Sequence, residues 1–265
     1  MDKRAIGIFD SGAGGLTALK VVREILPDED VVYFGDTKNV PYGEKSREDV
    51  IKLAHLNIEF LKSKDVKVIL AACGTVSSQL ERIKCDIPVF GIVESACKKA
   101  VSVTKNGKIS VLATTTTINS GIYRKTCMKQ SEEVEVSEYA CPKLATLIEN
   151  GHTSVDDKEL VEALSEYLGG VNASEADTLV LGCTHYAIVE SAIRRILRNK
   201  DISLVDTGRE AVYALKDFIC RNDMQSGNNG KSAGVRYFIS GDRGKFAKIA
   251  SDFLMLDIEG EIFDI

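Results

Sequence analysis

Histidine is scarce in this chain of 265 residues, tryptophan is absent, and no apolar run approaches the thickness of a bilayer. The last absence excludes a membrane-spanning helix, which needs about 20 apolar residues. The cysteines form no CxxC pair, and Cys183 with His185 lacks two further ligands at a recognisable spacing. The sequence therefore predicts no metal site.

Nucleotide-binding glycine patterns are missing as well. Gly12, Gly14 and Gly15 do not form GxGxxG, because Thr17 occupies the last glycine position, and the chain has no Walker A pattern. A glycine-rich turn before a helix can still receive a carboxylate. We therefore expect no dinucleotide cofactor at this turn.

Charge of either sign is not concentrated in one place. The formal net charge of −5 is mild, and no basic stripe or polybasic segment indicates nucleic acid or an anionic membrane as a partner. A small-molecule ligand is the default expectation. The first apolar run reaches Asp10 too soon to form a signal-peptide core, so we expect a cytoplasmic protein.

Cysteine is the unusual residue that is present. The seven cysteines are odd in number and lie mostly in apolar segments, at positions 73, 85, 97, 127, 141, 183 and 220. This pattern favours reduced thiols over a disulfide framework.

Short apolar, β-branched runs alternate with helical patterns along the chain. Helices are expected over 47–64 and 158–170, the second ending at a glycine pair. The segment 129–159 is expected to be a surface excursion with a carboxylate-rich start. The alternation predicts an α/β fold with mainly parallel sheets flanked by helices, and the length favours two domains. The predicted strands are 5–9, 31–35, 66–72, 87–93, 109–113, 178–182, 202–205 and 235–240.

A polar residue follows most of these strands. Ligands of open parallel sheets bind beyond the carboxyl ends of the strands, so these residues are candidates for a ligand site. They are Asp10-Ser11, Asp36, Cys73, Glu94, Thr114 to Thr117, Cys183-Thr184-His185 and Asp206.

Two of these residues, Cys73 and Cys183, each end a strand and precede a helical segment. Amide dipoles at a helix N-terminus lower a thiol pKa and favour the thiolate. His185, two residues after Cys183, is a possible proton partner for Cys183. Asp10 is a possible proton partner for Cys73, because it too follows a strand at the same edge of the predicted sheet. Two related half-sites that face one cleft would explain the similar positions of the two cysteines.

Each of these residues also has a structural interpretation. A single cysteine or histidine is typical of a buried core position, and Asp10-Ser11 could cap a helix that begins near Gly14. The run Thr114 to Thr117 is as consistent with a helix cap as with a cluster of ligand-binding hydroxyls. Glu149 is consistent with a carboxylate on a helix surface, although it could also reach the cleft.

The motifs together resemble the glutamate racemases, cofactor-independent amino-acid racemases that supply D-glutamate for peptidoglycan synthesis. The resemblance spans nearly the whole chain, and "FDSGAGGLT" with "LGCTHY" is its most specific part. The matching segments are "GIFDSGAGGLT" (7–17), "YFGDTKNVPYGEKS" (33–46), "LAACGT" (70–75), "VLATTTTINSGIY" (111–123), "CPKLATLIENG" (141–151), "LVLGCTHY" (179–186) and "VDTG" (205–208).

The resemblance implies two similar α/β domains related by a pseudo-twofold, with the active site in the cleft between them. We place the first domain at 1–97 plus 210–265 and the second at 98–209. The resemblance also implies glutamate as the substrate, no cofactor and a homodimer.

The resemblance further implies a set of site residues. Cys73 and Cys183 are the expected catalytic bases, assisted by Asp10 and His185 respectively. The expected substrate-binding residues are Asp10, Ser11, Tyr42, Gly43, Gly74, Thr75, Thr184 and His185.

The chain departs from the family pattern beside the first cysteine. The pattern is usually Cys-Asn-Thr, whereas this chain has Cys73-Gly74-Thr75; smaller departures are Glu94-Ser95 for Glu-Pro, and Ala187 for a proline. Glycine leaves only its backbone N–H and extra room where an asparagine amide would contact a substrate.

Three alternatives stay open at this point. The first is a racemase of aspartate or another acidic amino acid, although aspartate racemases typically carry glutamate at the position of His185. The second is a homologue that binds an amino acid without turnover. The third, a thiol redox protein, is weak because two thiols across an amino-acid site are not expected at disulfide distance.

Overall fold

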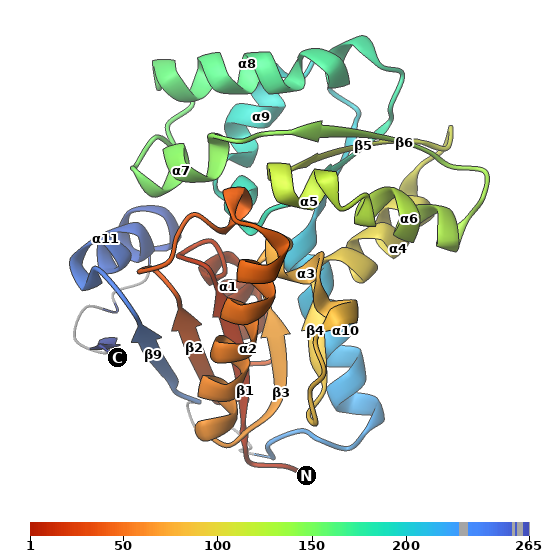
Figure 1. The fold of residues 1–265 in the computed structure, drawn as a ribbon. Coiled ribbons are helices and arrows are strands. Elements are labelled where there is room, and N and C mark those ends of the chain that lie inside the picture. Colours follow the sequence, from red (N-terminus) through yellow and green to blue (C-terminus); the bar gives the residue numbers. More distant parts are fainter. Residues whose placement is uncertain (228–232, 256–257, 259–261, 265) are drawn as a thin grey trace.

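Two parallel β-sheets flanked by helices form the protein, as the sequence predicted (Figure 1). The structure, a computed structural model, describes residues 1–227, 233–255, 258 and 262–264. The first sheet has the strand order β10-β9-β2-β1-β3-β4, and the second has the order β6-β5-β7-β8. The order β2-β1-β3-β4 in the first sheet is matched by the order β6-β5-β7-β8 in the second, since in each the earliest strand lies between the second and the third and the fourth is at the edge. The parts of the molecule that contain the first and the second sheet, called here the first half and the second half, therefore share one topology.

The strands of the first sheet are β1 (Ala5–Asp10), β2 (Val31–Gly35), β3 (Val66–Ala71), β4 (Val89–Gly91), β9 (Val235–Ile239) and β10 (Ile262–Asp264). The strands of the second sheet are β5 (Lys108–Ala113), β6 (Glu135–Ala140), β7 (Thr178–Leu181) and β8 (Ser203–Asp206). The eight strands predicted from apolar runs are all present. In β1, β2 and β3 every residue is buried, because helices cover both faces of the sheet.

The helices are α1 (Leu16–Ile25), α2 (Arg47–Ser63), α3 (Gly74–Ser77), α4 (Val93–Val103), α5 (Thr115–Asn119), α6 (Ile122–Gln130), α7 (Leu144–Glu149), α8 (Lys158–Ala173), α9 (Glu190–Ile196), α10 (Thr207–Arg221) and α11 (Arg243–Leu254). Three short 3₁₀ segments, η1 (Tyr42–Glu44), η2 (Leu80–Arg82) and η3 (Thr184–Val189), follow β2, α3 and β7. Among the described residues, none of the helices is long and apolar enough to span a membrane.

Two details of the sequence prediction are wrong. The segment 129–159 is not only a surface excursion, because it contains the edge strand β6 and the helix α7. The partly exposed, carboxylate-containing sequence of β6 hides its strand character. Helix α8 continues through Gly169 and Gly170 to Ala173, and the ring of Tyr139 occupies the space where a side chain of residue 170 would lie.

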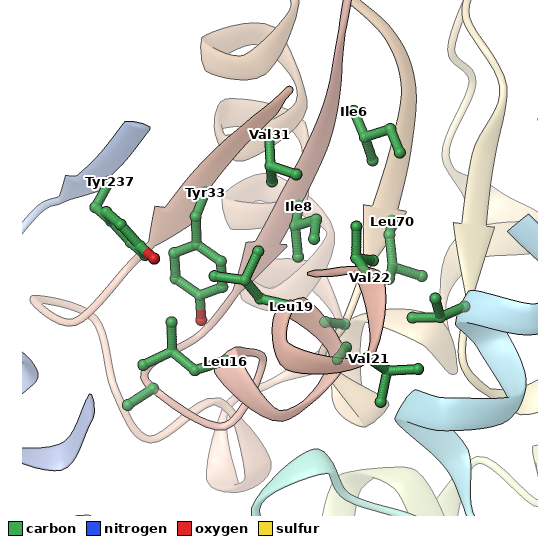
Figure 2. Close-up of a cluster of buried hydrophobic side chains, with 14 of the residues drawn as sticks. Ile6, Ile8, Leu16, Leu19, Val21, Val22, Val31, Tyr33, Leu70 and Tyr237 are labelled. Atoms are coloured by element: carbon green, nitrogen blue, oxygen red, sulfur yellow. The ribbon is translucent and has the colours of Figure 1, made fainter. Parts of the chain in front are cut away.

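Helices on both faces give each sheet two apolar layers. Figure 2 shows α1 contributing Leu16, Leu19 and Val22 to the layer that contacts Ile8 and Leu70 of the first sheet. Helices α10 and α11 complete this layer, and α2 covers the opposite face. In the second sheet, α7, α8 and α9 pack on one face and α4 and α6 on the other.

The proposed domain boundaries fall within helices. The boundary at 97/98 lies inside α4, and the boundary at 209/210 lies inside α10, two helices that contact each other. Nevertheless, every strand of the first sheet lies within 1–97 or 210–265, and every strand of the second sheet lies within 98–209. The division into 1–97 plus 210–265 and 98–209 therefore stays a prediction.

A fully buried ion pair lies at the end of the first sheet where its strands begin. Lys67 Nζ lies 2.5 Å from Glu29 Oε2 and also donates to the carbonyl oxygens of Asp2 at 2.9 Å and Met224 at 2.6 Å. Glu29 in turn accepts from the backbone N–H of Ser226 at 2.9 Å. These bonds tie together segments that are far apart in the sequence.

Replacing Glu29 should therefore be costly. We expect Glu29→Ala to lower the free energy of unfolding by about 3–5 kcal/mol, because it leaves the Lys67 ammonium buried without its counter-charge. Urea denaturation would measure this loss. The exposed pair Lys108–Glu175 provides the control, and Glu175→Ala should cost no more than about 1 kcal/mol. Similar losses in both variants would contradict the assigned importance of the buried pair.

Candidate active site

The residues that the sequence predicted for the site all line one pocket between the two sheets. The strands of the first sheet point toward the half of the molecule that contains β5 and β6 (Figure 1). The predicted residues that line the pocket are Asp10, Ser11, Tyr42, Gly43, Cys73, Gly74, Thr75, Cys183, Thr184 and His185. The sequence thus predicted residues that share one pocket, while the assignment of this pocket as the active site and the roles of its residues stay predictions.

The pocket is nearly closed in this conformation. Its cavity volume is about 30 Å³, which is roughly the space needed for one or two waters. Pockets that hold small-molecule ligands usually exceed about 300 Å³. A substrate therefore requires side chains that line the pocket to move.

Cys73 reaches the pocket from the first sheet. It follows β3 and is 5% exposed, and its thiol donates to the hydroxyl oxygen of Ser11 at 3.6 Å. Burial, with a further contribution from the charge of Asp10, raises the pKa of the Cys73 thiol to about 12. Cys73 is therefore a protonated thiol at neutral pH.

This result corrects the sequence prediction that a helix dipole lowers the pKa of Cys73. Helix α3 has only four residues, so its dipole is small, and burial disfavours the thiolate more strongly. The hydrogen-bonding partner is also Ser11 rather than the expected Asp10, which acts on Cys73 through its charge.

Cys183 reaches the pocket from the second sheet and begins a chain of three side chains. Its Sγ atom lies 3.6 Å from Nδ1 of His185, and Nε2 of His185 lies 2.9 Å from Oε1 of Glu149. Burial alone lowers the pKa of His185, but the hydrogen bonds with Cys183 and Glu149 outweigh burial and raise it well above its ordinary value. His185 is therefore an imidazolium at neutral pH that faces the sulfur of Cys183.

Glu149 is a functional candidate that the sequence left open between a helix-surface carboxylate and a residue that reaches the cleft. It ends α7 and is largely buried, and although burial raises its pKa, the hydrogen bond and charge of His185 hold the pKa below its ordinary value. Only the position of Glu149 within the motif "CPKLATLIENG" gave a signal for it. Its partner is 36 residues away in the chain, so no local pattern could join them.

Asp10 lies in the pocket and does not cap the first residue of α1. Its carboxylate accepts from the backbone N–H of Gly12 at 2.8 Å, and the hydroxyl of Thr184 lies 3.4 Å away. Burial raises the pKa of Asp10, an effect that the positive charge of His185 opposes. A buried carboxyl group here links the first sheet electrostatically to the second.

Hydroxyl groups join the two halves beside Cys73. The Thr75 hydroxyl lies 3.0 Å from that of Thr114, which lies 2.9 Å from that of Thr117. Thr116 donates to the carbonyl oxygen of Gly43 at 2.7 Å. The threonine run therefore contacts the first half directly, a role that the sequence had left open between a cap and a hydroxyl cluster.

Other polar residues that follow strands lie outside the pocket lining. Asp36 is buried and accepts from the Tyr42 hydroxyl at 2.5 Å, which positions the segment that carries Tyr42 and Gly43. Asp206 instead caps α10 by accepting from the N–H groups of Gly208 and Arg209, and Glu94 lies in the first turn of α4.

The geometry defines a class of protein, namely an α/β protein with a buried acid/base pocket between two topologically similar parallel sheets. The family model for "Asp/Glu/Hydantoin racemase" matches residues 17–215. The glutamate racemase of Thermoanaerobacter pseudethanolicus is 38% identical over 260 residues, which cover 98% of this chain and 96% of that protein.

Solved structures agree with the sequence relatives. The glutamate racemase isoform RacE1 of Bacillus anthracis superimposes with a TM-score of 0.92 at 31% identity, covering 100% of this chain and 98% of that chain. The glutamate racemase of Francisella tularensis in complex with D-glutamate has a TM-score of 0.88 at 32% identity, covering 100% and 97%. The chain belongs to the Asp/Glu/Hydantoin racemase family, and it is an amino-acid racemase.

Removing the charge of Glu149 should move the pH profile. Glu149→Gln keeps the shape of the side chain but removes the carboxylate that raises the pKa of His185. His185 therefore loses its proton at lower pH, and we expect the alkaline limb of kcat/KM to shift down by at least about one pH unit. Racemisation rates measured from pH 6 to 10 would test this.

Glu162→Gln, an exposed position on α8, is the matched control and should leave the profile in place. An unchanged alkaline limb in Glu149→Gln would show that the imidazolium of His185 does not govern the reaction.

Proposed function

We propose that the protein is a glutamate racemase that interconverts L-glutamate and D-glutamate by proton transfer between two cysteines, without a cofactor. The observation that carries this proposal is that Cys73 and Cys183 come from different sheets and line the same buried pocket. The relatives and structural neighbours named above are glutamate racemases, and the Francisella protein binds D-glutamate.

The two thiols have different surroundings, and this difference suits a reaction that needs one base and one acid. The imidazolium of His185 faces the sulfur of Cys183, whereas Cys73 lies beside the Ser11 hydroxyl and burial raises the pKa of its thiol. In one direction the Cys183 thiolate removes the α-proton, and the electron pair of the broken C–H bond passes to the α-carbon and its carboxylate. The Cys73 thiol then donates its proton to the opposite face of the α-carbon.

After one turnover the protons have changed places, so Cys183 is a thiol and Cys73 a thiolate. This state is ready to act on the product enantiomer in the reverse direction. Because each cysteine takes both roles, the titrations of the two thiols are coupled. Burial, and beside it the charge of Asp10, disfavours the thiolate of Cys73.

The carbanion needs stabilisation by fixed donors, since the proposed reaction has no cofactor to accept its electrons. The hydroxyls of Ser11, Thr75 and Thr184 line the pocket and are our candidates for binding the substrate carboxylates. Desolvation in the closed pocket strengthens such hydrogen bonds. We further propose that the D-glutamate serves peptidoglycan synthesis in the cytoplasm and that the enzyme is a homodimer.

The decisive experiment follows solvent deuterium into the substrate. The purified protein is incubated in D₂O, without added cofactor, with L-glutamate, D-glutamate or L-aspartate, while NMR follows the α-proton and circular dichroism follows chirality. Both glutamate enantiomers should converge to a deuterated racemate. Turnover confined to aspartate would instead support an aspartate racemase, and no turnover would support a binding protein.

Substitution of either cysteine should abolish racemisation. We expect Cys73→Ala and Cys183→Ala each to lower the rate by at least about 100-fold, because an acid/base group typically contributes that much. Cys220→Ala, at an exposed position, is the control and should retain full activity. Racemisation that survives in either Cys73→Ala or Cys183→Ala would refute the two-cysteine mechanism.

A further inference from the structure

Four glycines of the first half contact the second half where side chains would not fit. A Cβ atom on Gly12 would collide with the Glu149 carboxylate, and one on Gly14 would collide with the His185 ring. A Cβ on Gly43 would lie 2.8 Å from Cβ of Thr114, and one on Gly74 would lie 2.5 Å from the carbonyl oxygen of Gly182. The two halves therefore meet through glycine backbone.

Gly74 differs from the other three because its neighbour is backbone. The side chains that face Gly12 and Gly14 can rotate away, and the atom nearest to Gly43 is the Cβ of Thr114. At Gly74, by contrast, the neighbour is the backbone carbonyl of Gly182, which can move only with the chain that follows β7. Gly182 is also held from behind, since its N–H donates to the Leu112 carbonyl at 2.7 Å and its own carbonyl oxygen lies 3.4 Å from the Tyr123 hydroxyl. A Cβ on Gly182 would itself lie 2.7 Å from the Leu112 oxygen.

This contact connects the two cysteines through the backbone. Gly74 directly follows Cys73, and Gly182 directly precedes Cys183. The separation of Gly74 from Gly182 therefore sets the separation of the two thiols. Ordinary van der Waals contact begins at 3.4 Å, so a Cβ on Gly74 would force the backbones about 1 Å farther apart.

We propose that Gly74 is a positioning residue, whose missing side chain lets the two halves close until both thiols reach one α-carbon. The inference rests on the proposed two-cysteine function. The asparagine that the family pattern places after the first cysteine would keep the halves of this chain farther apart. Gly74 is thus a determinant of closure rather than only the loss of a substrate contact.

A wider spacing of the two thiols should slow inversion of the α-carbon more than it slows exchange of the α-proton with solvent. One thiolate can still remove and return the α-proton on its own face, but the opposite thiol is too distant to complete the inversion. A misplacement of about 1 Å can lower a rate by about 100-fold. The ratio of exchange with retention to inversion therefore reports the spacing directly, and a general loss of stability would not change it.

The test compares Gly74→Ala and Gly74→Asn with the wild type, using L- and D-glutamate in D₂O. We expect kcat for inversion to fall by about 10- to 100-fold in both variants, with a smaller change in KM and a rise in the exchange-to-inversion ratio. Gly169→Ala is the matched control, because a Cβ there meets open space in α8, and it should match the wild type.

Two outcomes separate the inference from the proposed function. A wild type that does not racemise glutamate would refute the proposed function itself. A wild type that racemises, with an unchanged kcat and ratio in a folded Gly74 variant, would refute the positioning role alone. Gly74→Asn guards against misfolding of Gly74→Ala, since the family pattern has asparagine at this position.

Discussion

The close contact between the carboxyl ends of the two sheets is the constraint on which the rest of the site depends. Parallel strands bring their polar end residues to one edge, and here two such edges face each other around a cavity of about 30 Å³. Glycines at the contact allow backbone to meet backbone. The ionisable groups between the halves are consequently removed from water.

Removal from water explains why similar residues behave differently. Cys73 lies beside the Ser11 hydroxyl, and burial together with the nearby Asp10 raises the pKa of its thiol, whereas Cys183 faces a histidine whose positive charge Glu149 maintains. A helix dipole is a minor influence on Cys73 beside these effects, because α3 has only four residues and the thiol is buried. The same pocket therefore contains two cysteines in different electrostatic surroundings.

The two ends of the strands in the first sheet, called here the amino edge and the carboxyl edge, have different roles. At the amino edge, Lys67 and Glu29 are buried and fully partnered, and they join the chain near Asp2 to the segment after α10. At the carboxyl edge, Asp36 and Asn57 both contact the Tyr42 hydroxyl, which holds the loop beside the pocket. One edge stabilises the sheet, and the other positions groups that face a ligand.

The sequence by itself determined the fold class, eight of the strands, and the residues around both cysteines, because continuous apolar runs and strand-end polar residues are local patterns. It could not reveal the strand character of the polar edge strand β6, the partnership of Glu149 with His185, or the direction of the Cys73 pKa shift. Those features depend on which distant segments meet and how much water they exclude. Gly74 is the clearest case, since only the tertiary structure shows the carbonyl of Gly182 in the space where a side chain would lie.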